Sequence, residues 1–233
     1  MTNNLDINKK LGEFNFDKPI LEFYKRYFQN CFVVFHPFYY KVFADNYNPL
    51  DKFNLTYPLT ERITWGEIIK RTKISDIKRL ALAITHNACN SYHQSLVKKE
   101  HEILSSFYKF ANIVEPYWDE DKIPEDLIVS FLELLMKSGY REIKVGHWPE
   151  IADKKVDVIK LTNENKFESA LRCANQNFII TTDNKYCLKL PYHDFPYTFL
   201  LTNEVSAAKV AADLNYEGFL ADNKTEVYWY LDK

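Results

Sequence analysis

Apolar and polar positions in the second half of the chain recur in a fixed order. An apolar run ends in Leu-Thr-Asn-Glu at 161–164 and again at 201–204, and a helical pattern follows each. A short apolar run comes next, then Asp-Asn-Lys at 183–185 or 222–224, then another apolar run. Thr and Asn favour helix N-termini, and Asp-Asn tolerates the positive φ of a tight hairpin. The order predicts two copies of strand, helix, strand and strand.

A looser third copy precedes these two. A helix is predicted from Glu125 to Lys137, followed by strands at 141–146 and 155–161. One helix with a two-strand ribbon cannot bury its own apolar surface, so the copies are expected to share one core. We therefore predict one mostly antiparallel sheet from 141 to 231, with helices near 163–174 and 203–214 on a common face.

The first half has mainly helical patterns. An amphipathic helix is predicted over 19–30, because Pro is favoured at a helix start, and a short strand over 31–35. Residues 45–59 contain two prolines and several asparagines and predict a loop. Thr64 and Glu67 form a capping box that predicts the start of another helix.

A long run without Gly or Pro extends from Ser75 to Pro116, and apolar residues keep helical spacing within it. The pattern over 75–113 favours one continuous or kinked helix. Ser91 and Gln94 resemble a second start signal, so a pair of helices is the alternative.

These patterns together predict an α+β fold, with a mainly helical N-terminal half packed on a mostly antiparallel sheet of repeated helix–strand–strand units. We divide the chain into a flexible segment (1–18), a helical region (19–123) and a repeat region (124–233), the last two within one compact domain. The 233 residues are 46% apolar, enough for a sizeable core without disulfides or metal.

Charge and cysteine content narrow the class of protein. The net charge is −2, and only 6 of the 30 basic residues are Arg, which argues against a nucleic-acid partner. No apolar stretch is long enough for a membrane span or a signal peptide. The cysteines are far apart and predict reduced cytoplasmic thiols: Cys31, Cys89, Cys173 and Cys187. The abundance of Lys, Asn, Tyr and Phe suggests a bacterial source.

One set of side chains has the spacing of metal ligands. His86, Cys89 and His93 would lie on the same side of one helix, with Glu100 and His101 two turns further on. Imidazole and thiolate suit zinc. The same positions border the apolar stripe, where histidines commonly have packing roles. We therefore expect no metal and no other cofactor.

A His–Asp pair lies between two prolines. His193 and Asp194 have aromatic residues on both sides, and a stiff loop presenting such a pair would suit acid–base catalysis. Adjacent residues in an extended loop usually point apart. A structural connector between two strands is therefore the simpler interpretation.

The segment 115–126 combines six acidic residues with two aromatic ones. Aromatic side chains anchor protein interfaces, and charges steer association. The segment therefore predicts partner-binding residues, and a solvated loop is the alternative interpretation. The candidate residues are Tyr117, Trp118, Asp119, Glu120 and Asp121.

The sequence does not reveal a reaction. The common nucleotide-binding and hydrolase signatures are absent, and five scattered glycines do not form a phosphate-binding loop. Our first hypothesis is a non-catalytic cytoplasmic protein-binding module, of the kind that includes antitoxins and immunity proteins. The alternatives are a metal-assisted hydrolase and a small-molecule binder in a groove between the two halves.

Overall fold

A computed structural model describes residues 4–13, 16–40, 62–89, 98–114, 122–146, 156–191 and 195–231. The chain forms two compact units. The first comprises Met1–Phe35 and Asp121–Trp229, and the second comprises His36–Glu120 and Tyr230–Lys233. The first unit is therefore assembled from both ends of the sequence.

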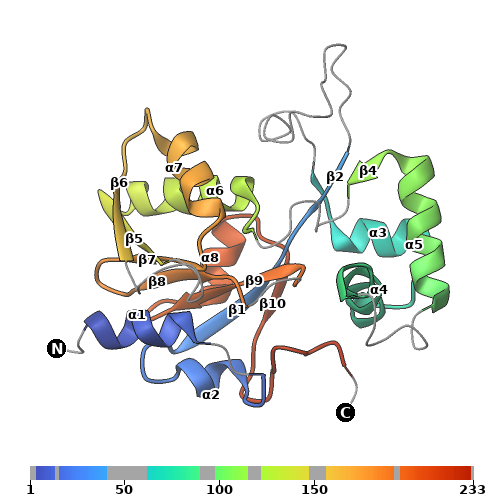
Figure 1. Cartoon of the computed structure of the whole chain (residues 1–233), viewed down its shortest axis with the longest axis horizontal. Coiled ribbons are helices and arrows are strands. Elements are labelled where there is room, and N and C mark those ends of the chain that lie inside the picture. Colours follow the sequence, from blue (N-terminus) through green and yellow to red (C-terminus); the bar gives the residue numbers. More distant parts are fainter. Residues whose placement is uncertain are drawn as a thin grey trace. The chain divides into compact units, whose positions relative to one another are not determined.

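A seven-stranded sheet forms the centre of the first unit, and every strand pairing in it is antiparallel (Figure 1). This confirms the predicted α+β class and the mostly antiparallel sheet. In spatial order the strands are β10 (Gly218–Leu220), β1 (Asn30–Phe35), β9 (Tyr197–Thr202), β8 (Tyr186–Lys189), β7 (Phe178–Thr181), β5 (Glu142–Gly146) and β6 (Val156–Lys160).

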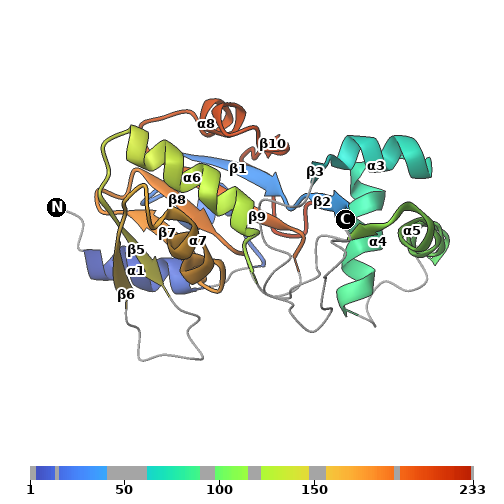
Figure 2. The same cartoon turned by 90° about the horizontal axis from the view of Figure 1, so that it is seen from above.

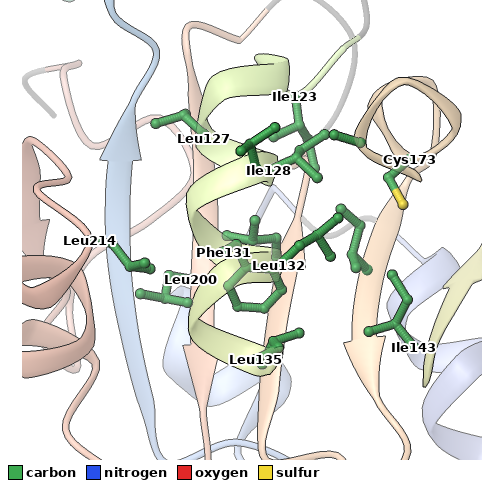
Figure 3. Close-up of a cluster of buried hydrophobic side chains, with 14 of the residues drawn as sticks. Ile123, Leu127, Ile128, Phe131, Leu132, Leu135, Ile143, Cys173, Leu200 and Leu214 are labelled. Carbon is green, nitrogen blue, oxygen red and sulfur yellow. The ribbon is translucent and has the colours of Figure 1, made fainter. Parts of the chain in front are cut away.

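Three helices cover one face of this sheet: α6 (Glu125–Lys137), α7 (Lys166–Ala174) and α8 (Ala207–Asp213). Helix α6 lies between the other two (Figure 2) and contributes Phe131, Leu132 and Leu135 to the core (Figure 3). Cys173 of α7 and Leu214, just after α8, close the core on its two sides. The two predicted helices thus share a face of the sheet.

The opposite face is covered as well, by α1 (Asn4–Gly12) and α2 (Ile20–Tyr24) (Figure 1). Ile7 and Leu11 of α1 are buried, so this helix packs within the segment that the sequence predicts to be flexible. Both faces of the central strands are therefore buried, and all six residues of β9 are inaccessible.

The two repeat copies agree only in part. Strands β6 and β7 flank β5, with α7 between them in sequence, and β9 and β10 flank β1, with α8 between them. The strand predicted at 226–231 is wrong, because residues 227–230 form turns. Strand β1 also enters the sheet from the first half of the chain, which the repeat pattern does not predict.

The two Leu-Thr-Asn-Glu motifs have different roles. Thr162 and Asn165 bond each other's backbone N–H groups ahead of α7, at 3.2 and 2.8 Å. In the second copy Ser206 is the N-cap of α8, where its hydroxyl accepts from Lys209 N. The repeat as a whole is not confirmed and stays a prediction.

The second unit contains a three-stranded antiparallel sheet of β2 (Phe38–Tyr40), β3 (Arg62–Ile63) and β4 (Ile113–Val114). Its helices are α3 (Trp65–Thr72), α4 (Ile77–Cys89) and α5 (Lys98–Ala111). The Thr64 hydroxyl caps α3 by accepting from Glu67 N, as the sequence predicts. A mainly helical N-terminal half is not confirmed, because strands β1 to β4 all lie in it.

The prediction of one continuous helix over 75–113 is wrong. Arg79 of α4 forms an ion pair of 2.6 Å with Glu100 of α5. Residues so far apart in sequence would be roughly 30 Å apart along a single helix. Arg79 and Glu100 therefore belong to two separate helices that contact each other, which is the predicted alternative. No helix in the described part of the chain is long and apolar enough to cross a membrane.

Two glycines with positive φ give a test of the β10–β1 pairing. A Cβ at Gly218 (φ 156°) would lie 1.8 Å from the Val33 carbonyl oxygen, whereas one at Gly139 (φ 93°) would meet nothing within 4 Å. We expect Gly139→Ala to cost about 1 kcal/mol, the penalty of its backbone conformation. Gly218→Ala is expected to cost about 2 kcal/mol more, because the backbone of β1 must shift. Urea unfolding of both variants measures the loss of unfolding free energy. Equal losses in the two variants would contradict the pairing of β10 with β1.

Candidate functional site

The side chains that the sequence singles out are not brought together by any described element. Tyr117, Trp118, Asp119, Glu120, Asp121, His93, His193 and Asp194 lie outside the described residues. His86 and Cys89 belong to the last turn of α4, and only their backbone is described. These proposals therefore stay predictions.

Metal coordination gains no support from the described side chains. Among them, no group of three or more His, Cys, Asp or Glu residues is arranged to hold a metal ion. His101 of α5 instead lies 3.4 Å from the Ser105 hydroxyl, one turn along its own helix. The described part of the chain thus gives the metal-assisted hydrolase no observation to build on.

A buried lysine in β8 is the most unusual titratable group among the described residues. Lys189 is 0% exposed, and its cross-strand neighbours are Phe178 and Phe199. Its ammonium donates to the Asn177 side-chain oxygen and, at 2.6 Å, to the Leu190 carbonyl. These acceptors replace part of the hydration that the amine loses on burial.

Asn177 is fixed by its backbone as well as by Lys189. Its N–H donates to the Gly146 carbonyl at 2.8 Å, and its carbonyl accepts from Leu190 N at 2.9 Å. The side-chain NH₂ is buried and has no acceptor among the described residues. The pair therefore joins three neighbouring strands, β5, β7 and β8, at one end of the sheet.

Burial controls the charge of Lys189. Because desolvation disfavours the ammonium, it lowers the pKa of Lys189 to about 7. An amine with such a pKa is partly neutral at physiological pH and can accept a proton. Neither groove described below is lined by Lys189. The measurable consequence of this geometry is a pH-dependent stability.

Sequence reasoning missed this pair, although a signal is present. Alternation along β8 places Lys189 on the same face as Cys187 and opposite to Leu188. A lysine in a short apolar strand whose two faces are both buried cannot reach water. Recognising this required knowledge that helices cover both faces of the sheet.

The thiols of the first unit are inert. Cys31, Cys173 and Cys187 are buried and form no disulfide. Burial raises the pKa of all three, and that of Cys173 to about 12. Thiols in this state are poor nucleophiles and act as small apolar groups.

Helix α7 exposes apolar side chains on its outer surface. Its inner face, formed by Ala170, Cys173 and Ala174, is buried in the core. Phe167 and Leu171 lie one turn apart on the outer side and are 46% and 47% exposed. Neighbouring exposed apolar side chains on one face of a helix can serve as anchors for a partner.

An open groove of about 660 Å³ adjoins this side of α7. It is lined by residues of α6, of the segment after α6, of the segment between β6 and α7, and of the first turn of α7: Glu133, Met136, Lys137, Arg141, Leu161, Thr162, Asn163, Glu164 and Lys166. The Lys166 ammonium bonds Glu133 and lies 5.1 Å from the centroid of the Phe167 ring. Lys166 thus links the groove to the Phe167 ring, and we name the groove residues together with Phe167 and Leu171 the α7 surface.

Comparison with known proteins identifies a family. No curated protein and no solved structure matches the chain. A family model described as a protein of unknown function, DUF2711, matches residues 16–231. The match covers almost the whole chain, including every strand of both sheets and all helices except α1. The chain therefore belongs to the DUF2711 family of proteins of unknown function.

Proposed function

We propose that this chain is a non-catalytic protein-binding module and that the α7 surface is where it contacts its partner. The observation that carries the proposal is the exposure of Phe167 and Leu171 on a helix whose other face is fully packed. A helix held in this way presents its outer side chains rigidly, which lowers the entropic cost of binding.

The composition of the α7 surface resembles that of a protein interface. Interfaces combine a few apolar anchors with a polar, charged rim. Phe167 and Leu171 supply the anchors, and Lys137, Arg141 and Glu164 supply charges at the groove. A groove this open would leave much of a small ligand in water, whereas a protein segment can cover both groove and helix.

We propose a bacterial cytoplasmic location for the protein. The support is the state of Cys31, Cys173 and Cys187, which lie in the core without disulfides. Reduced buried thiols are typical of proteins from a reducing compartment.

The acidic segment at 115–126 is proposed as a second contact with the partner. If it binds the partner, Trp118→Ala is expected to cost roughly 2 kcal/mol of binding free energy, chiefly through faster dissociation. Asp119→Asn combined with Glu120→Gln is expected to slow association and flatten its salt dependence. Surface plasmon resonance at several salt concentrations separates the two effects. Unchanged rate constants in both variants would remove this segment from the interface.

Affinity capture with matched variants tests the proposal. Tagged wild-type chain, Phe167→Ser and Val158→Ser are compared in extracts of the source organism. Val158 on β6 is 55% exposed, so its substitution is a control for the loss of an exposed apolar side chain elsewhere. We expect a defined protein to be retained by the wild type and the control and lost with Phe167→Ser. Equal capture by all three chains would contradict binding through the α7 surface.

A further inference from the structure

We infer that the groove between α1 and α2 binds acidic peptide segments. This groove, of about 330 Å³, is lined by Lys9, Lys10, Glu13, Glu22, Phe23, Lys25, Arg26 and Tyr27. Four of these residues are cationic and two are anionic, in a chain whose net charge is −2. The cations are therefore concentrated at this groove against the charge of the whole protein.

One lysine of the groove is held by neighbouring side chains, and two others can bind a ligand. Lys10 is held in place, with its ammonium 3.2 Å from Glu13 and 3.4 Å from the centroid of the Phe23 ring. Lys9 and Lys25 are exposed and form no ion pair among the described residues. These two ammonium groups can therefore pair with carboxylates of a ligand without breaking an existing bond.

The same residues favour a peptide over other polyanions. Glu13 and Glu22 oppose the dense phosphate charge of a nucleic acid or lipid surface more strongly than the spaced carboxylates of a peptide, and they can accept hydrogen bonds from peptide N–H groups. Ile7 and Leu11 of α1 are buried, so neither of these apolar side chains is available for insertion into a bilayer. The Phe23 and Tyr27 rings add apolar contact for the ligand's side chains.

This groove is a separate surface from the α7 surface, so the inference stands or fails independently of the proposed function. The probe is a fluorescein-labelled synthetic peptide of glutamate and tyrosine, and its glutamine counterpart is the uncharged reference. Fluorescence anisotropy with the full chain is expected to show binding of the acidic peptide alone, weakening as salt screens the charges.

Variants of exposed residues locate the binding without disturbing the fold. Lys9→Glu combined with Lys25→Glu is expected to weaken acidic-peptide binding at least tenfold, because two attractive contacts become repulsive. Glu22→Gln is expected to strengthen it about threefold. Lys160→Glu combined with Lys209→Glu changes the net charge equally at exposed positions outside the groove and is expected to leave affinity within about twofold.

Three outcomes would overturn the inference. Equal weakening by the groove and control pairs would show a general charge effect. Binding of the glutamine peptide with the same affinity would remove the role of the cations. Tighter binding of single-stranded DNA or of phosphatidylserine vesicles than of the acidic peptide would assign the groove to a different class of partner.

Discussion

The double variant Phe167→Ala and Leu171→Ala is expected to weaken binding of the partner by about 3 kcal/mol, on the order of a hundredfold in Kd. Both side chains are nearly half exposed in the chain, so a partner that covers them gains their remaining apolar area. Truncation removes that gain and leaves a gap at the centre of the interface. Isothermal titration calorimetry with the captured partner measures the change.

The same double variant is expected to keep its stability. Exposed side chains away from special backbone features usually change the unfolding free energy by less than about 0.5 kcal/mol. Val158→Ala, on the outermost strand of the sheet, is the matched control and is expected to leave the affinity unchanged. A double variant that unfolds more easily but binds normally would show that these residues support the fold and not the interface.

Replacing Lys189 with methionine is expected to remove a pH dependence of stability. The folded chain holds this amine with a pKa of about 7, whereas the unfolded chain restores its ordinary value of about 10.4. Between these values the unfolded state binds more protons, so stability rises with pH. From about pH 7 to pH 8.5 the wild type should gain roughly 1.5 kcal/mol relative to Lys189→Met.

The pH window is chosen to separate Lys189 from the buried thiols. Burial raises the pKa of Cys31, Cys173 and Cys187, so they reduce stability only once the unfolded thiols ionise, above about pH 8.5. Lys209→Met, at an exposed position of α8, is the control and should follow the wild type. Urea unfolding measures the free energy of unfolding at each pH. If this free energy changes with pH in the same way for the wild type and Lys189→Met, the amine stays charged across the window.

The sequence predicts the local elements of the repeat region well. The apolar runs become β5 to β10, and the helices at 166–174 and 207–213 start within a few residues of their predicted positions. Local patterns succeed here because signals such as the Asp183 turn before β8 and the Ser206 cap of α8 mark where elements begin. The run at 226–231 is apolar, as a strand would be, but residues 227–230 form turns, and the Trp229 ring packs against Phe35 of β1 and Phe219 of β10.

Such local patterns do not predict which strands pair when they are far apart in the sequence. Strand β1 enters the sheet between β9 and β10, although more than 160 residues separate it from β9 in sequence. Helices α1 and α2 lie against the second face of the sheet, and Cys187 and Lys189 of β8, which share one face of their strand, are both buried. The sequence also does not predict the α7 surface, because there apolar residues are exposed where burial would be expected. Phe167 and Leu171 fit an apolar pattern, and only the packed structure shows that Ala170 and Cys173 occupy the core.

Photocrosslinking in living cells tests binding through α7 most directly. Phe167 is replaced by benzoylphenylalanine in the chain expressed in its source organism, and Val158 is replaced in the same way as the control. Ultraviolet light joins the probe only to molecules within a few ångströms of it. Binding through the α7 surface predicts one discrete crosslinked protein from position 167 and none from position 158. No crosslink at position 167, or the same products from both positions, would contradict it.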